Sequence, residues 1–553
     1  MQKLLFTIFF LGFSLYLQAQ PNAFFYRVDF TDKNNSNFSL ERPLEFLTQK
    51  SLDRRAYQGI TLDSLDLPVN EWYVDSVLAH NSVLVHRTKW FNGITVKVAP
   101  VDTLAFRDVE NLPFVKEIKL VRIGSSSKMQ NKFALEEAST APIDPIYTPN
   151  YGMGFRQIEM LQLDLLHNLG FRGEGKVIAI LDNGYRGIQD GAAFDSMISN
   201  GQLLGYFDFV DGDSNVFNDA THGTTVLSTI AANDPGFMIG AAPKASFYLF
   251  NTEDNQSESP LEEDHWTRAA EYADSLGVDA LNTSLGYNTF DDPQFNFTYE
   301  DLDGETTRIS VANGIAASKG MLVVSSAGNE GRSSWFHITA PADAKGAMIA
   351  GAVHDDEIAT SFTSRGPTAD GRLKPDLCAM GSDVIVANQN GNYVRTSGTS
   401  FAAPILAGAA LSLWSAYSDR SSAEIIEMLV QSGDRYSNPD TIYGHGIPNV
   451  YTALLRGSNA DTFVYHGSSN EAIVYPNPVE DQAKIYFGIV PAGTYFLSIS
   501  DAFGNLIYRV EVEQRDGNYL EFDIPYTQKL ARGGYVATLH NQNFKEAVRF
   551  FKL

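Results

Sequence analysis

Hydrophobic and polar positions divide the chain into stretches with different periods. Residues 24–30, 91–98 and 114–123 alternate like strands, and residues 43–58 have helical spacing. We therefore expect a small α+β domain over residues 20–123. The tract from 124 to 150 is polar, has no apolar period and holds three prolines, which predicts a linker.

From residue 151 to 458, short apolar runs alternate with helical segments. The runs are almost continuously hydrophobic, as parallel strands buried on both faces are. They cover residues 176–182, 246–252, 279–286, 321–328 and 347–353. The pattern predicts an α/β domain, a mostly parallel sheet with helices on both faces. Ligands of such sheets bind beyond the carboxyl ends of the strands, so the residues after each run are candidates for chemistry.

From residue 470 to 553 the helical period disappears. Residues 483–490, 493–513, 534–541 and 546–553 have the pattern of short strands separated by Gly, Asn and Asp turns. A small β-sandwich is the fold that this pattern favours.

Composition and charge narrow the class of protein. The chain is 44% hydrophobic and 19% charged, which is typical of folded domains. Its formal net charge of −25 argues against a nucleic-acid partner, because phosphate binding needs clustered Lys and Arg.

The N-terminus predicts export. Lys3, an apolar run from Leu4 to Leu17 and the small Ala19 form a secretory signal, residues 1–19. A membrane anchor is the alternative, but it needs about 20 apolar residues, more than this run supplies. The single cysteine, Cys378, rules out an internal disulfide and lies between apolar residues, so we expect a buried thiol.

Four polar residues stand at strand ends or helix starts. Asp182 follows one apolar run, Asn329 follows another, His222 begins a helix and Ser400 begins an apolar helix. A serine hydroxyl becomes a nucleophile when a base held by an acid takes its proton and a fixed donor meets the oxyanion. Taken singly, each residue also has a structural explanation as a turn or cap residue, and Ser400 in particular could be an N-cap.

The strings around these residues decide between the two explanations. "AILDNG", "HGTTV", "SAGNEG" and "SGTSFAAP", in this order, resemble the catalytic segments of the subtilisin-like serine proteases. The resemblance implies that Asp182 orients His222, that His222 is general base and then acid, and that Ser400 attacks. Asn329 and the Ser400 amide would hold the oxyanion. Asn183 departs from the family, which usually has Ser or Thr there.

The resemblance also implies a substrate site. A peptide would lie along "NTSLG" as an added strand. Two segments would form the walls of the primary specificity pocket, and Thr339 would lie near its base. One wall is Ser284, Leu285 and Gly286, and the other is Ser326, Ala327 and Gly328.

The chemistry needs no cofactor, and no metal ligand is assigned. Structural calcium is possible because the resembled family often binds it, but no ligand set can be named. The stretch 211–222 begins like a calcium loop, yet Val216 and His222 stand where an EF-hand has Gly and Glu, which excludes that motif.

Both flanking domains carry resemblances of their own. The N-terminal domain is similar to protease propeptides, which fold and inhibit the enzyme; a permanent accessory domain is the alternative. The C-terminal domain opens with "YPNP" and ends in a strand with a lysine. It resembles the sorting domains of the type IX secretion system in Bacteroidetes, with a carbohydrate-binding or spacer sandwich as the alternative.

Together these features predict a serine endopeptidase that hydrolyses peptide bonds through an acyl-enzyme. We expect it to be exported across the inner and outer membranes and then released or attached to the cell surface. Its expected partners are a protein or peptide substrate, its own propeptide and the type IX machinery. The alternative class is a catalytically inactive surface binding protein that retains the fold.

Overall fold

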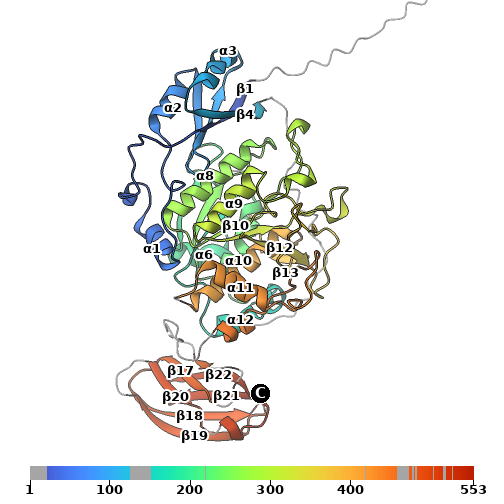
Figure 1. Ribbon diagram of the computed structural model, residues 1–553. Coiled ribbons are helices and arrows are strands. Elements are labelled where there is room, and N and C mark those ends of the chain that lie inside the picture. Colours follow the sequence, from blue (N-terminus) through green and yellow to red (C-terminus); the bar gives the residue numbers. More distant parts are fainter. Residues whose placement is uncertain are drawn as a thin grey trace, which may run out of the picture.

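The computed structural model describes residues 22–124, 151–217, 220–417, 419–457, 472–475, 477, 479, 482–501, 503–514, 519–525 and 527–552. The predicted signal at 1–19 and residues 125–150 of the predicted linker lie outside these ranges. Within the described part of the chain, no helix is long and apolar enough to cross a membrane. Figure 1 shows the C-terminal strands beyond α12, apart from the helix-flanked sheet.

The N-terminal domain is an antiparallel sheet covered by helices. Its strands are ordered β2-β3-β1-β4, with bounds Ser82–Thr88, Gly93–Val98, Ala23–Phe30 and Val115–Gly124. Helices α2 (Glu71–Leu78) and α3 (Thr103–Phe106) pack on one face through a core that includes Val28, Val74, Ile94 and Phe106. Because β4 includes Gly124, the expectation that the linker starts at 124 is wrong by one residue.

A long excursion separates β1 from α2. It contains the short helix η1 (Pro43–Glu45) and helix α1 (Gln49–Tyr57). The helix expected over residues 43–58 is therefore interrupted, because Thr48 is extended and caps α1, its Oγ1 accepting a hydrogen bond from Ser51 N at 3.2 Å.

The central domain is built on seven parallel strands. Their order is β13-β12-β11-β10-β5-β9-β6. The bounds are Leu377–Met380, Met348–Val353, Leu322–Ser326, Ala280–Thr283, Val177–Asp182, Ser246–Asn251 and Leu203–Asp208. Two short hairpins accompany the sheet, β7–β8 (Asn233–Asp234 and Met238–Ile239) and β14–β15 (Val384–Ala387 and Tyr393–Thr396).

Helices cover both faces of this sheet, as the sequence predicts. In β5, Ile178 and Ile180 face a core shared with α7 (His222–Ala231) and α10 (Thr399–Ser415), whereas Ala179 and Leu181 face a core shared with α8 (Leu261–Leu276) and α9 (Arg308–Ser318). The face with α10 also carries α5, α6, α11 and α12, with bounds Leu163–Asn168, Ala192–Ser199, Ser422–Gln431 and Val450–Gly457. The α/β fold class is confirmed.

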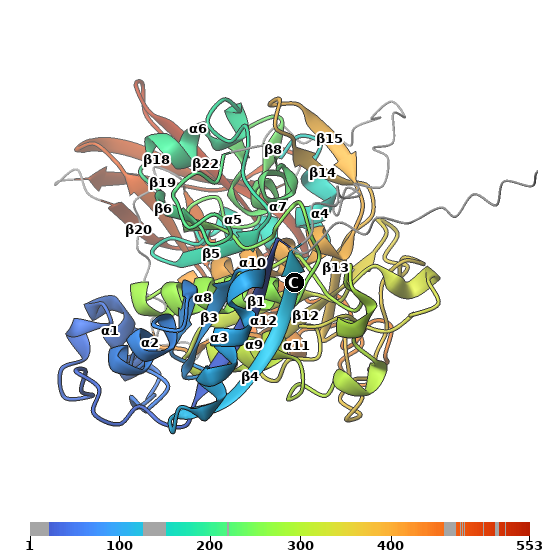
Figure 2. The same ribbon diagram turned by 90° about the horizontal axis from the view of Figure 1, so that it is seen from above.

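The N-terminal domain lies on α8 and α9, and Figure 2 shows its strands above these helices. Arg27 of β1 is buried there, with its Nε 2.8 Å from Asp264 Oδ1 and its Nη2 2.9 Å from Glu263 Oε2. Buried charges are stable in proteins only when they are paired, so this contact is a specific one.

A histidine pair crosses the same interface. His86 Nε2 of β2 lies 2.7 Å from His265 Nδ1 of α8, with the rings edge to face. The charged groups that face the pair are Asp264 and Arg268. Burial and the neighbouring His265 lower the pKa of His86 to about 3.

The C-terminal domain is a sandwich of two antiparallel sheets. One has the order β16-β17-β20 (Ile473–Tyr475, Lys484–Ile489, Tyr519–Asp523) and the other β19-β18-β21-β22 (Leu506–Gln514, Gly493–Asp501, Gly533–His540, Lys545–Lys552). Both sheets contribute to a core of their own that includes Ile485, Phe487, Leu497, Ile499 and Phe550.

Candidate active site

Asp182 and His222 meet at the carboxyl edge of the parallel sheet. Asp182 ends β5 and His222 is the first residue of α7. His222 Nδ1 lies 2.7 Å from Asp182 Oδ1, and both side chains are buried. An imidazole whose Nδ1 is bonded to a carboxylate keeps Nε2 as the atom that can take a proton from a nucleophile.

Asn183 holds the start of α7 beside this pair. Its backbone N–H donates to Asp182 Oδ1 at 2.8 Å, and its side-chain Oδ1 accepts a hydrogen bond from His222 N at 3.2 Å. The departure from the Ser or Thr of the resembled family therefore leaves a residue that binds the backbone of His222.

Ser400 lies in the first turn of α10. The N-cap of this helix is Gly398, and Ser400 Oγ donates to Ser284 O at 3.2 Å. Ser400 is therefore not an N-cap, and that explanation of the residue is wrong. The adjacent Phe401 places the start of α10 against the candidate base, because its ring centroid lies 5.9 Å from that of His222.

Asn329 lies after β11, with its side chain exposed. Its Oδ1 accepts two hydrogen bonds from Thr399, from the backbone N at 2.9 Å and from Oγ1 at 3.0 Å. Because both bonds use the amide oxygen, the orientation of the amide is fixed and its NH₂ is kept as a donor. Thr399, which was not among the predicted site residues, thereby ties Asn329 to the first turn of α10, one residue before Ser400.

The two wall segments come together at Thr339. A Cβ atom added to Gly286 would lie 2.2 Å from Thr339 Oγ1, and one added to Gly328 would lie 2.7 Å from the same atom. Gly328 also has a φ of +102°, a conformation that favours glycine. The sequence therefore needs glycine at both positions, since any larger residue would collide with Thr339.

The remaining wall residues contribute mainly backbone. Leu285 and Ala327 point into the core shared with α8 and α9. Ser284 Oγ donates to Ser400 O at 2.8 Å, and Ser326 Oγ donates to Leu285 O at 3.4 Å. The walls are thus tied to each other and to the head of α10.

The part of the chain that the structure describes contains no cluster of metal-binding side chains. In those ranges no three His, Cys, Asp or Glu side chains gather to hold a metal ion. At the end of β6, Asp208 Oδ1 accepts hydrogen bonds from the backbone amides of Val210 and Asp211, so this oxygen is engaged by its own turn. No ligand set for structural calcium is assigned.

The arrangement brings a carboxylate, an imidazole, a hydroxyl and an amide donor to one edge of the sheet. A buried Asp bonded to His suits the His for accepting and returning a proton. The first turn of α10 presents backbone N–H groups that have no acceptor within the helix, and its dipole favours a negative charge there. Such a site can transfer an acyl group to a serine.

Comparisons with known proteins assign each domain. Residues 173–446 match the subtilase family, residues 25–136 match a peptidase S8 propeptide domain of Bacteroidota, and residues 473–552 match a secretion system C-terminal sorting domain. These matches confirm all three resemblances found in the sequence.

Individual relatives agree. Subtilisin E of Bacillus subtilis is 28% identical over 369 residues, which cover 66% of this chain and 82% of the relative. Subtilisin of Bacillus pumilus is 29% identical over 300 residues, 54% of this chain and 97% of the relative. The crystal structure of the epidermin leader peptide processing serine protease from Staphylococcus aureus shares the fold, with a TM-score of 0.53 and 17% identity, over 79% of this chain and all of that one. The chain is therefore a subtilisin-like serine peptidase, with a subtilase-family domain at residues 173–446, a propeptide domain before it and a type IX secretion sorting domain after it.

Proposed function

We propose that the protein is an active serine endopeptidase whose triad is Asp182, His222 and Ser400. The observation that carries this proposal is the 2.7 Å contact of buried Asp182 with His222, beside the first turn of α10, which contains Ser400. Ser400 Oγ attacks the peptide carbonyl carbon while its proton passes to His222 Nε2. Asp182 stabilises the imidazolium that forms and holds the ring in one orientation.

Two groups donate hydrogen bonds to the oxyanion, the Asn329 side-chain amide and the Ser400 backbone N–H. When the intermediate collapses, the C–N bond breaks and His222 returns the proton to the leaving amine. A water molecule, deprotonated by His222, then attacks the acyl-enzyme, and the second product leaves with Ser400 restored.

The substrate lies between the two wall segments. Its backbone pairs with residues 284–286 as an added strand, and the side chain before the scissile bond enters the pocket that ends at Thr339. The contacts of Gly286 and Gly328 with Thr339 support a pocket of limited depth.

The propeptide domain acts as template and inhibitor. Its last strand, β4, leads towards the active-site edge, since Arg122 Nη1 contacts Asp254 Oδ2 at 2.8 Å and the neighbouring Asn255 contacts Asn183 at 3.4 Å. Cleavage in the linker between 124 and 150 would free this edge. The sorting domain directs export by the type IX system, after which the enzyme is released or attached to the cell surface.

A comparison of the parent chain with Ser400→Ala tests the catalytic proposal. We expect the mature parent to hydrolyse casein and to be labelled on Ser400 by a serine-directed phosphonate, as seen by peptide mass spectrometry. Ser400→Ala should do neither. Casein hydrolysis that survives the substitution would exclude the mechanism, and a folded parent without activity would favour the surface binding protein.

A further inference from the structure

The excursion between β1 and α2 reaches a part of the catalytic domain that the propeptide sheet does not cover. We call residues 48–66 the arm; it contains helix α1 (Gln49–Tyr57). Figure 1 shows α1 at a distance from α2 and α3, below them along the side of the catalytic domain. The arm there contacts the C-terminal ends of α8 and α9.

The arm supplies hydrogen-bond donors to carbonyls in the last turn of α8 and just after it. Ser51 Oγ donates to Asp274 O at 2.7 Å, Thr48 N donates to Ser275 O at 2.9 Å, and Arg54 Nη1 donates to Val278 O. The last carbonyls of a helix have no intrahelical donor, so these contacts complete the end of α8. A cation such as Arg54 also suits the negative end of the helix dipole.

The glycines that terminate the two helices are in direct contact with the arm. Gly277, after α8, has a φ of +79°, and a Cβ atom there would lie 2.6 Å from Ser51 N. Gly320, after α9, has a φ of +87°, and a Cβ atom there would lie 2.8 Å from Ile60 Cδ1. Gln58 Nε2 donates to Gly320 O at 2.7 Å. The arm therefore packs directly against the backbone at both helix ends, and a side chain at Gly277 or Gly320 would collide with it.

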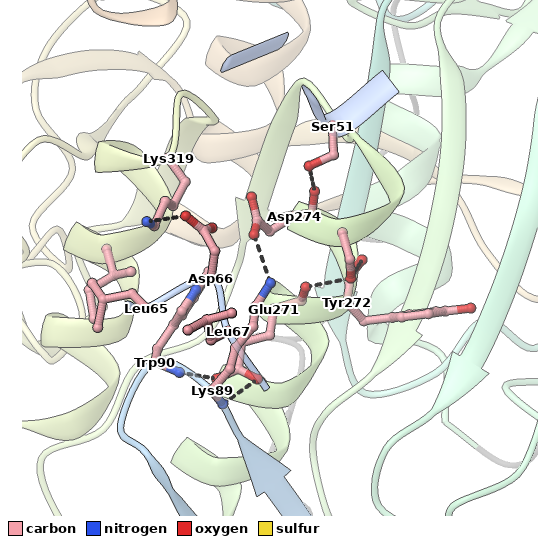
Figure 3. Close-up of polar contacts among 12 residues, drawn as sticks. Ser51, Leu65, Asp66, Leu67, Lys89, Trp90, Glu271, Tyr272, Asp274 and Lys319 are labelled. Carbon is pink, nitrogen blue, oxygen red and sulfur yellow. Dashed lines mark hydrogen bonds and ion pairs between the residues drawn. The ribbon is translucent and has the colours of Figure 1, made fainter. Parts of the chain in front are cut away.

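A buried charge network joins the arm to α8. Asp274, in the last turn of α8, contacts Arg54 Nη2 at 2.6 Å, Arg55 Nη2 at 2.8 Å and Lys89 Nζ at 3.0 Å. Although Asp274 is buried, these three cations hold its pKa well below the usual range. Figure 3 shows Asp274 with Ser51 and Lys89 around it.

The network continues to α9. Asp66 of the arm contacts Arg55 Nη2 at 2.8 Å and Lys319 Nζ, just after α9, at 3.1 Å. Arg55, Asp66, Asp274 and Lys319 are all almost completely buried. Each side of the interface thus supplies a charge that the other neutralises, and removing one partner would leave a buried charge without compensation.

The arm also touches the opposite helical layer. Gln58 Oε1 accepts hydrogen bonds from Ser422 N and Ser422 Oγ, both at 3.1 Å, at the start of α11. Tyr57 OH donates to Arg420 O. One segment therefore binds helices from both faces of the sheet.

The position of these contacts separates them from catalysis. In a parallel sheet, the helix between two strands runs back across the sheet and ends at its amino edge, the edge where the strands start. The C-terminal ends of α8 and α9 precede β10 and β11, whereas Asp182 ends β5 and Asn329 follows β11 at the carboxyl edge. The arm and the cleft thus lie at opposite edges of one sheet.

We propose that the arm holds the propeptide domain on the catalytic domain after the linker has been cut, through contacts that do not involve the cleft. The proposal rests on the proposed function of residues 20–123 as a propeptide that leaves the enzyme. After the linker is opened, the rate at which the propeptide leaves then depends on the contacts of the arm with α8, α9 and α11, in addition to those of the propeptide sheet with α8.

The test uses the full chain with Ser400→Ala, so that the catalytic proposal plays no part in the result. A recognition sequence for a site-specific protease is inserted after Lys132, the chain is cut there, and the dissociation rate of the propeptide fragment is followed by size exclusion. Arg55→Ala removes one cation of the arm. Arg87→Ala is the matched control, because Arg87 is exposed and pairs with Glu71 of its own domain at 3.0 Å.

We expect the cut parent and Arg87→Ala to keep the fragment, and Arg55→Ala to lose it about 100-fold faster or more, as for a buried pair with one partner removed. If Arg55→Ala does not fold, Gln58→Ala carries the test, with an expected acceleration of about tenfold. Equal rates for the arm variant and Arg87→Ala would overturn the proposal. Immediate loss of the fragment from the cut parent would overturn it as well.

Discussion

Replacing Thr339 with glycine should deepen the primary specificity pocket. Thr339 Oγ1 lies within 2.2 Å and 2.7 Å of the positions that Cβ atoms would take on Gly286 and Gly328, so its side chain fills the space between the two walls. That oxygen is buried and has no hydrogen-bond partner in the described part of the chain. The substitution therefore removes volume without breaking a hydrogen bond.

The size of the effect follows from the volume removed. The threonine side chain has three heavy atoms, which leaves room for about two or three more carbon atoms of substrate. Burying each carbon is worth about 0.8 kcal/mol, or about 1.6 to 2.4 kcal/mol in total. Since about 1.4 kcal/mol is tenfold in rate, the ratio of kcat/KM for Phe over Ala before the scissile bond should rise about 15- to 60-fold.

Peptide anilides that differ only in this residue (Ala, Leu or Phe) measure the ratio. Thr339→Val is the matched control, because it replaces the hydroxyl with a methyl group of similar size. It should leave the ratio of kcat/KM for Phe over Ala close to that of the parent. A ratio that Thr339→Gly does not change would refute the placement of Thr339 at the pocket base. An equal shift in Thr339→Val would show that the hydroxyl, and not the depth, sets the preference.

Two further predictions concern the oxyanion and the propeptide interface. Asn329→Ala should lower kcat about 100- to 1000-fold with little change in KM, measured on one anilide substrate; equal turnover would remove Asn329 from the oxyanion hole. Because the pKa of His86 is held at about 3 in the interface against about 6.5 when free, the bound state favours neutral His86, and its contribution is lost as pH falls below 6.5. Dissociation of the cut propeptide should therefore become about fivefold more favourable between pH 6.5 and 5.5. His86→Gln should abolish this dependence, and His80→Gln should keep it.

The core of the fold was predictable because its strands are buried on both faces. In β5 every residue is buried, so the apolar run at 176–182 identifies the strand and its end at Asp182. The candidate site was predictable for a related reason. Ser400 and His222 lie in the first turns of helices, and Asp182 lies at the end of a strand. Parallel topology brings the carboxyl ends of the strands, and the helix starts that follow them, to one edge of the sheet.

The arm could not be predicted in the same way. Helix α1 buries Ser51, Arg54 and Arg55, which on an isolated helix would belong to a solvated face. Their common partner, Asp274, is more than 200 residues away in the sequence, and so is Lys319, the partner of Asp66. No local pattern reports such distant pairing, and for the same reason the sequence did not show that Thr399, rather than a cap at Ser400, orders the head of α10.

Cys378 has a practical consequence for handling this enzyme. Its thiol is fully buried in β13, where desolvation raises its pKa well above the usual value, and the reactive form of cysteine is the thiolate. Reducing agents therefore find no disulfide within the chain to break, and alkylating reagents find no ready nucleophile in the folded state. Dithiothreitol or iodoacetamide, each used separately, should therefore leave the activity unchanged. This profile separates the activity from that of contaminating cysteine proteases, which iodoacetamide inactivates.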